Sequence, residues 1–166
     1  MGVILLDDVI RPAVEEYGTK QPMIEVGSGN TARGREYGDC TCTDRVHPVD
    51  RPTDVLADGH MLPFRDRGVG TVFCFETLEH VVNPMGFVKE VSRVLKEGGI
   101  FYLTTVFVWV YHPEPVDYWR FTTTAIKMLL SSFKLLPLKI FEWRGCNYRI
   151  GEQFLNDHIL GVAIKR

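Results

Sequence analysis

The stretch TVFCFETLEHVVNPMGFVKEVSRVLKEGGIFYLTTV, residues 71–106, has the pattern of a strand, a helix and a second strand. Its ends, residues 71–75 and 100–106, are short apolar runs without polar alternation, which is typical of strands buried on both faces of a sheet. A helix between two such strands forms a parallel crossover, so the stretch predicts a sheet that is covered on both sides.

The helix of this crossover has clear boundaries in the sequence. Asn83 can cap its first turn and Pro84 suits its first position, while Gly98 and Gly99 are expected to end it. One apolar stripe recurs along it at helical spacing: Phe87, Val88, Val91, Val94 and Leu95. The stripe predicts a helix that packs on the sheet through a single face.

Further elements extend this pattern in both directions along the chain. Apolar runs predict strands at residues 23–26, 40–43 and 54–57, and a closing pair of strands at residues 134–143 and 158–165. Helical patterns predict a short first helix at residues 12–17 and a later helix at residues 122–132. Alternating strands and helices predict an α/β doubly wound sheet, and a length of 166 residues predicts a single domain over residues 1–166.

Composition argues against several classes of protein. The 19 Lys and Arg residues against 21 Asp and Glu residues, with a pI near 6.2, argue against a nucleic-acid partner. The longest mainly apolar run, residues 100–111, is shorter than the roughly 20 residues that a membrane span needs, so we expect no membrane association. The N-terminal segment MGVILL lacks the features of a signal peptide, which favours a cytoplasmic protein.

The four cysteines, Cys40, Cys42, Cys74 and Cys146, include no CxxC pair. Structural zinc sites usually draw their ligands from such closely spaced pairs, so buried thiols are favoured over zinc binding. No other metal-ligand spacing is evident, and we therefore expect no metal site.

Candidate binding residues follow the predicted strands at their carboxyl ends, where doubly wound sheets bind ligands. The first strand leads into Glu25-Val26-Gly27-Ser28-Gly29, whose glycines let the backbone turn tightly and approach a ligand. Asp44 ends the second strand and could accept hydrogen bonds from two ribose hydroxyls. The third and fourth strands end in DGHMLPF, residues 58–64, and FETLEH, residues 75–80. Each feature alone fits an ordinary turn, but four of them on one rim predict a binding site.

From about residue 23 to residue 133, the chain resembles class I S-adenosylmethionine-dependent methyltransferases of the methyltransferase-11-like group. The segments that carry the resemblance are EVGSG, ADGHMLPF, ETLEHVVNP, RVLKEGG and HPEPVDYWRFT. The resemblance implies a Rossmann-like three-layer sandwich with a seven-stranded, mostly parallel sheet whose last strand is antiparallel. It also implies that S-adenosyl-L-methionine binds over the first, second and fourth strands and leaves as S-adenosyl-L-homocysteine after methyl transfer.

The resemblance also implies a set of cofactor contacts. The residues implied for the methionine and ribose part are Glu25, Gly27, Ser28 and Gly29, with Asp44 on the ribose hydroxyls. The residues implied for the adenine are Asp58, Gly59 and His60, and those implied near the sulfonium are Phe75 and Glu76.

Two features depart from the family pattern. Thr31 stands where many members have a third glycine, and only about ten residues separate the loop from the second strand, so the first helix must be short or missing. Only about twenty residues precede the first strand, where members often carry helices that cover the substrate. The active site is therefore expected to be open, or covered by a second subunit in a homodimer.

A second set of candidates lies after the fifth predicted strand. Pro113 and Pro115 exclude regular strand structure, so residues 112–120 are expected to form a loop on the same rim. The candidate substrate-binding residues are Trp109, Tyr111, Asp117, Tyr118 and Arg120, with Glu114 as a further polar group of the same loop. The structural alternative is that Trp119 and Phe121 anchor the next helix and that Arg120 pairs with Asp117.

Methyl transfer to an oxygen nucleophile also requires that a proton be removed. His112 is the first candidate for the general base, because its ordinary pKa of about 6.5 lies near working pH and it lies on the substrate loop. His80 is the second candidate, because the helix after the fourth strand would direct it towards the cofactor. A structural role is the alternative for both histidines.

The acceptor and the reaction class leave alternatives open. An aromatic, polar loop is consistent with a small-molecule or saccharide acceptor, methylated on oxygen or nitrogen. One rival interpretation is an NAD-dependent oxidoreductase, because Gly27, Gly29 and Ala32 also satisfy a permissive G-x-G-x-x-A pattern. A second rival is a non-catalytic module that binds the cofactor or regulates a partner.

Overall fold

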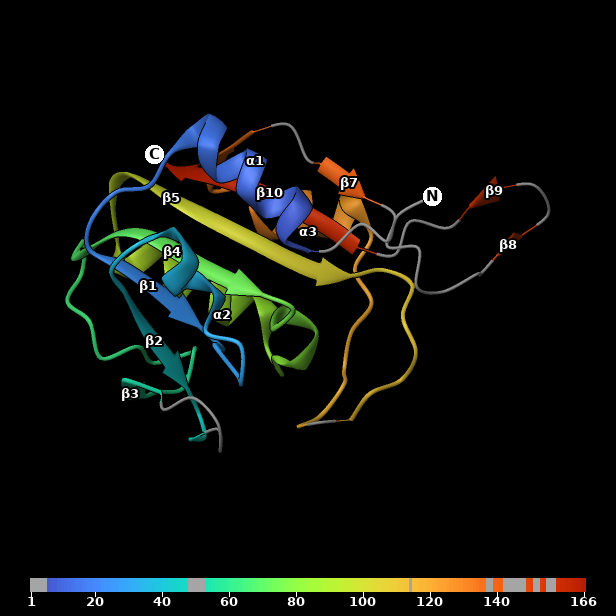
Figure 1. The fold of residues 1–166 in the computed structure, drawn as a ribbon, viewed down its shortest axis with the longest axis horizontal. Coiled ribbons are helices and arrows are strands. Elements are labelled where there is room, and N and C mark those ends of the chain that lie inside the picture. Colours follow the sequence, from blue (N-terminus) through green and yellow to red (C-terminus); the bar gives the residue numbers. More distant parts are fainter. Residues whose placement is uncertain are drawn as a thin grey trace.

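The computed structural model describes residues 6–47, 53–113, 115–136 and 158–166, and the backbone of residues 139–141, 149–150 and 153–154. A central sheet passes through the molecule in the strand order β3-β2-β1-β4-β5-β10-β6 (Figure 1). The strands in chain order are β1 (Met23–Val26), β2 (Cys40–Asp44), β3 (Val55–Leu56), β4 (Val69–Phe75), β5 (Leu95–Val106), β6 (Phe133–Leu135) and β10 (His158–Lys165). β7 (Lys139–Phe141) also pairs with β10, and β8 (Arg149–Ile150) pairs with β9 (Gln153–Phe154) in a separate ribbon.

The strand directions confirm the predicted fold class. β1, β2, β3, β4 and β5 pair in parallel, whereas β10 is antiparallel to β5 and to β6. All seven residues of β4 and the last eight of β5 are buried, as expected for central strands that have helices over both faces.

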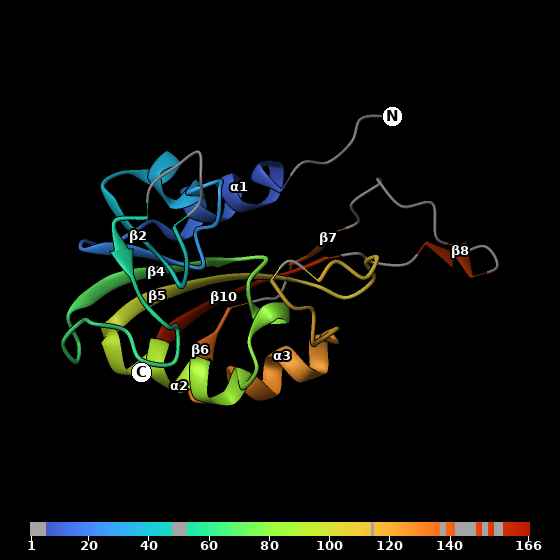
Figure 2. The ribbon, with the colours of Figure 1, turned by 90° about the horizontal axis from the view of Figure 1, so that it is seen from below.

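Helices cover the two faces unequally (Figure 2). α1 (Asp7–Tyr17) packs on one face, where Ile10 and Ala13 join the core cluster of Phe73 and Tyr102. α2 (Pro84–Val94) and α3 (Thr123–Leu129) pack on the other face, within a larger apolar core. The first crossover contains only the 3₁₀ helix η1 (Arg33–Tyr37), which confirms that the first helix of the family fold is shortened.

The prediction that Gly98 and Gly99 end the helix of the central crossover is wrong. α2 begins after the Asn83 cap, as predicted, but it ends at Val94 and the chain passes directly into β5. The pairing of β4 with β5 shifts register between Val69 and Thr71, and Gly98 lies opposite this irregularity with a φ of +69°. Glycine is therefore used here for a bulge in a strand and not for a helix end.

Two other helix boundaries differ from those predicted. α1 begins at Asp7 and includes Pro12, five residues earlier than expected, because its buried Ile10 packs on the sheet. α3 is shorter than residues 122–132, with Thr122 as its cap: the Thr122 side chain accepts a hydrogen bond from the Ala125 N–H.

Cys40, Cys42 and Cys74 are free and buried, which confirms the expectation of buried thiols for these three. Cys146 lies outside the described residues, as does Glu114. None of the helices in the described part of the chain has the length and apolar character that crossing a membrane requires.

Candidate functional site

The loop after β1 folds back on β2 and faces β4. The N–H groups of Gly27 and Ser28 both donate to the carbonyl oxygen of Thr43, at 2.9 and 3.0 Å. Gly27 has a φ of +75°, and a Cβ at this position would overlap the side chain of Thr77. Gly29 has a φ of +49°, but a Cβ there would meet nothing within 4 Å. The first glycine is thus required by the fold, whereas the second borders open space.

We expect Gly27→Ala to lower the free energy of unfolding more than Gly29→Ala does. Both substitutions place a side chain in the left-handed region, which costs about 1–2 kcal/mol. Only Gly27→Ala adds an overlap with Thr77, and overpacking of this kind costs about 1–3 kcal/mol more. Urea unfolding of the two variants tests this, and equal losses would show that Thr77 moves aside freely.

Asp44 closes the loop from the end of β2. Its Oδ2 accepts a hydrogen bond from the Gly29 N–H at 2.9 Å, and its Oδ1 accepts one from the Val46 N–H at 3.2 Å. The half-buried carboxylate therefore lies directly beside the open side of the glycine loop. This is the position that the sequence predicts for a residue that binds ribose hydroxyls.

Glu25 lies inside the protein, with an exposed fraction of 1%. Its carboxylate accepts a hydrogen bond from the Gly34 N–H at 2.8 Å and lies 3.7 Å from the Cys42 thiol. Burial raises the pKa of Glu25 to about 8. The side chain thus ties η1 to β1, a contact that the local sequence does not indicate.

We expect this buried carboxyl to make stability depend on pH. A folded-state pKa raised above the unfolded value means that the contribution of Glu25 is fully present below about pH 4.3 and is lost as pH rises through about 8. Between pH 5 and pH 8 the wild type should lose more than about 1 kcal/mol relative to Glu25→Gln, whose side chain cannot titrate. Urea unfolding at several pH values measures this difference, and parallel curves for the two proteins would contradict it.

The turn after β3 carries the three residues that the resemblance assigns to the adenine. Asp58 Oδ1 accepts a hydrogen bond from the His60 N–H at 2.9 Å and lies 2.7 Å from His60 Nδ1, and these contacts lower the pKa of Asp58. His60 Nε2 lies 3.1 Å from the Asn83 carbonyl oxygen, next to the start of α2. A Cβ at Gly59 would overlap the Phe87 ring, so this position has no room for a side chain. The turn is thus a rigid part of the rim.

At the end of β4, Phe75 is buried in the core and Glu76 leaves the strand in a strained conformation. Glu76 has a φ of +48°, and its N–H donates to the Thr104 carbonyl oxygen at 3.1 Å. Its Oε2 lies 2.8 Å from Nδ1 of the buried His158, whose ring lies 5.2 Å from that of Trp109. A non-glycine residue at positive φ at the end of a central strand is often found at functional sites.

The loop after β5, described at residues 107–113 and 115–121, is held by an ion pair between the Asp117 side chain and the partly exposed Arg120. The Asp117 side chain is 1% exposed, and the Arg120 guanidinium donates to its Oδ2 at 2.6 Å and to the Val110 carbonyl oxygen at 3.1 Å. The Arg120 guanidinium holds the pKa of Asp117 well below its usual range. Arg120 thus pairs with Asp117, as the structural alternative predicts for these two residues.

The aromatic residues of the same loop divide into anchors and exposed side chains. Phe121 is buried in the core cluster that contains Ile126 and Leu129 of α3, so it anchors the next helix as the structural alternative predicts. Trp119 donates from Nε1 to the Val81 carbonyl oxygen at 2.8 Å and is 42% exposed. Tyr111 and Tyr118 remain 72% and 49% exposed, and Trp109 is partly buried. Among the predicted substrate-binding residues, the two tyrosines are free to contact an acceptor.

The two candidate catalytic histidines, distant in sequence, come together at this rim. The ring centroids of His80 and His112 lie 4.8 Å apart at an interplanar angle of 87°. His80 Nδ1 lies 2.7 Å from the Val116 carbonyl oxygen, and His112 Nδ1 lies 3.0 Å from that of Val110. A carbonyl oxygen can only accept, so in the neutral form of each ring Nδ1 carries the proton and Nε2 keeps a lone pair.

Glu79 is not among the site residues that the sequence predicts. Its side chain is fully buried, and its Oε2 accepts a hydrogen bond from the Thr105 hydroxyl at 2.9 Å. Its Oε1 is also buried and has no hydrogen-bond partner among the described residues. Burial and the negative charge of Glu76 raise the pKa of Glu79. In the sequence, Glu79 directly precedes His80, a candidate base, and this adjacency could have marked Glu79 as a site residue.

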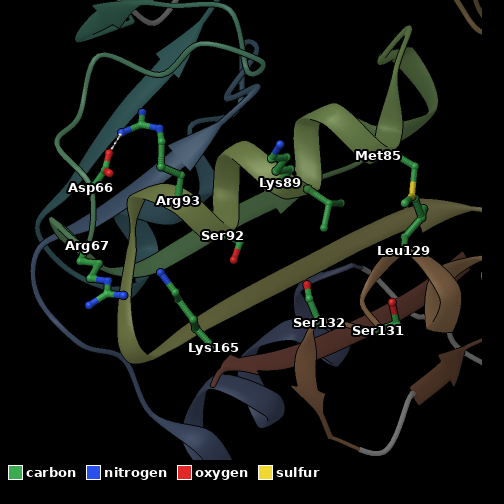
Figure 3. Close-up of a pocket in the computed structure, with 11 residues that line it drawn as sticks. Asp66, Arg67, Met85, Lys89, Ser92, Arg93, Leu129, Ser131, Ser132 and Lys165 are labelled. Carbon is green, nitrogen blue, oxygen red and sulfur yellow. Dashed lines mark hydrogen bonds and ion pairs between the residues drawn. The ribbon is translucent and has the colours of Figure 1, made fainter.

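A groove of about 520 Å³ lies elsewhere, between α2 and α3 (Figure 3). Its lining residues include Lys89, Ser92, Arg93, Ser131 and Lys165. Arg93 forms ion pairs there with Asp66 and Glu90, at nitrogen–oxygen distances of 2.6 and 2.7 Å. None of the candidate site residues lines this groove, so it is separate from the rim.

Comparison with known proteins agrees with the fold. Residues 24–103 match the family described as a methyltransferase domain. No curated protein matches the chain.

Solved structures share the fold at low sequence identity. A Burkholderia thailandensis 1,6-didemethyltoxoflavin-N1-methyltransferase, solved with bound 1,6-didemethyltoxoflavin and S-adenosylhomocysteine, superposes with a TM-score of 0.74 at 16% identity, over 94% of this chain and 77% of its own. The YcgJ protein of Bacillus subtilis gives a TM-score of 0.71 at 13% identity, over 95% and 97%. A Haloferax volcanii methyltransferase, solved with the Trm112 methyltransferase activator, gives 0.70 at 16% identity, over 93% and 87%.

The strand order and the structural matches agree on one fold. The chain has the fold of class I S-adenosylmethionine-dependent methyltransferases, and its residues 24–103 match the methyltransferase-domain family.

Proposed function

We propose that this protein transfers a methyl group from S-adenosylmethionine to an oxygen or nitrogen of a small molecule or saccharide. The observation that carries the proposal is the pairing of Asp44 with Gly29 at the carboxyl ends of β2 and β1. A carboxylate lies there beside a glycine that borders open space, which fits a nucleoside with two ribose hydroxyls.

The residues present fit the cofactor along the rim. Asp44 would accept hydrogen bonds from the ribose hydroxyls, and the backbone at Ser28 and Gly29 would lie against the methionine and ribose part. Asp58 and His60, fixed in the turn after β3, would border the adenine. The bound cofactor supplies an electrophilic methyl group on a sulfonium.

The acceptor would bind on the side of the rim formed by the loop after β5. Tyr111 and Tyr118 offer exposed aromatic surface there, and His112 has a lone pair on Nε2 that could take a proton from the acceptor. Asp117 lies 3.1 Å from His112 Nδ1 and orients the ring, while Arg120 holds Asp117 in place. We propose that Asp117 and Arg120 act on the acceptor through the loop that they fasten.

Calorimetric titration with S-adenosylmethionine and with NADH tests the cofactor. Saturable binding of S-adenosylmethionine alone is expected, and binding of NADH would favour the oxidoreductase instead. Transfer of a labelled methyl group to components of a metabolite extract then tests catalysis. Cofactor binding without any transfer would favour the non-catalytic module.

A homodimer would cover the exposed apolar side chains of the loop, such as Val110 and Val116. Light scattering tests this part of the proposal, since the monomer has a mass of 19.0 kDa. A monomeric mass at high protein concentration would show that the acceptor side of the rim is open.

A further inference from the structure

Three side chains from two loops meet at the acceptor side of the rim. Glu79 and His80 follow β4, and His112 follows β5; each offers a ligand atom, and these atoms all lie within 4.8 Å of one another. Two imidazoles and one carboxylate are a common set of protein ligands for divalent transition-metal ions. The sequence spacing gave no sign of this set, because His112 reaches it only through the fold.

The contacts around these side chains are those of oriented ligands. Both histidines turn Nδ1 to backbone carbonyl oxygens, which leaves the two Nε2 lone pairs available. The Thr105 hydroxyl holds Oε2 of Glu79. Such outer hydrogen bonds fix the tautomer and the direction of metal-binding side chains.

One polar atom of the cluster lacks the partner that its burial requires. Oε1 of the fully buried Glu79 has no hydrogen-bond partner among the described residues, and neither does the buried Oε1 of Glu76. An unsatisfied buried carboxylate oxygen is costly and calls for a water or an ion. Arg120 does not fill this role, because its guanidinium donates to Asp117 and to backbone carbonyls.

We propose that Glu79, His80 and His112 bind a divalent transition-metal ion. Three protein ligands leave at least one coordination position open, which suits an oxygen of the methyl acceptor. When the ion and the acceptor are both bound, the ion lowers the pKa of the acceptor hydroxyl and His112 serves as a metal ligand. His112 acts as the general base only in the protein without the ion. This role rests on the proposed methyl transfer, but binding of the ion does not.

Titration of the full chain, stripped of metal by a chelator, with Co²⁺ tests the proposal through the visible absorption of the bound ion. We expect one ion per chain and a loss of affinity of at least about 100-fold in Glu79→Gln, His80→Ala and His112→Ala. Thr105→Val, which removes only the hydrogen bond to Glu79, should weaken binding about 10-fold. His47→Ala, an exposed histidine outside the cluster, is the matched control and should bind as the wild type does.

Two results would overturn the proposal: no binding of Co²⁺ to the wild type at millimolar concentration, or binding that the cluster variants leave unchanged. Circular dichroism without the ion shows whether each variant folds. If Glu79→Gln does not, the two partly exposed histidine variants carry the test. Titration of the same samples with S-adenosylhomocysteine separates the two proposals, because binding of the cation without the nucleoside would reject only the methyltransferase function.

Discussion

Asp44→Ala is expected to weaken the binding of S-adenosylhomocysteine by at least about 100-fold. The proposed contacts are two hydrogen bonds from ribose hydroxyls to a charged acceptor, and each such bond contributes about 1.5–3 kcal/mol. The substitution also removes the acceptor of the Gly29 N–H, so the glycine loop loses its tie to β2. Isothermal calorimetry on the wild type and the variant measures the two dissociation constants.

Asp39→Ala is the matched control for this measurement. Asp39 is exposed and lies at the opposite end of β2, so its replacement makes the same change in net charge without touching the rim. The control should bind the nucleoside as tightly as the wild type. Equal affinities for all three proteins would show that Asp44 does not contact the ribose.

In the metal-free protein, His112→Ala is expected to lower the turnover number by about 10²–10⁴-fold, the usual contribution of a general acid or base. Affinity for S-adenosylhomocysteine should stay near the wild-type value, because the ring lies on the acceptor side of the rim and contacts His80 and the loop after β5. The measurement compares methyl transfer to an acceptor identified from the extract with cofactor binding by calorimetry.

His47→Ala should leave both quantities unchanged, since His47 is exposed and lies outside the cluster. A pure loss of acceptor affinity in His112→Ala, with the turnover number preserved, would make His112 a binding residue. Unchanged kinetics would remove it from the reaction.

The parts of the fold that follow from local pattern were predicted well. Unalternating apolar runs at β1, β4 and β5 gave the buried parallel strands, and Asn83 with Pro84 gave the start of α2. The end of α2 was missed, because Gly98 has the same local signal in a strand bulge as at a helix end. Local sequence does not distinguish these uses, since the register between β4 and β5 comes from long-range pairing.

The residues of the candidate site also fall into two groups: those that the sequence predicts and those that only the folded structure reveals. The alternation of strands and helices required a doubly wound sheet, and such a sheet places the residues that follow parallel strands on one rim. Asp44 and Gly29, fifteen positions apart, could therefore be placed on the same rim from the sequence alone, whereas the hydrogen bond between them came with the structure. The inward turn of Glu25 and the Asp117–Arg120 pair could not, because burial of a charged side chain depends on what packs over it.

The meeting of Glu79, His80 and His112 also came only with the folded chain. The pattern of a strand followed by a helix places each histidine near the rim, but the distance between them depends on the path of the loop after β5. That path is fixed by hydrogen bonds from Tyr118 and Trp119 to the Glu79 carbonyl oxygen, at 2.9 and 3.2 Å. Sequence periodicity thus predicted where the rim lies. Contacts between segments far apart in the chain brought these three side chains together on it. The reason is that tertiary hydrogen bonds and burial, and not local periodicity, set the paths of loops.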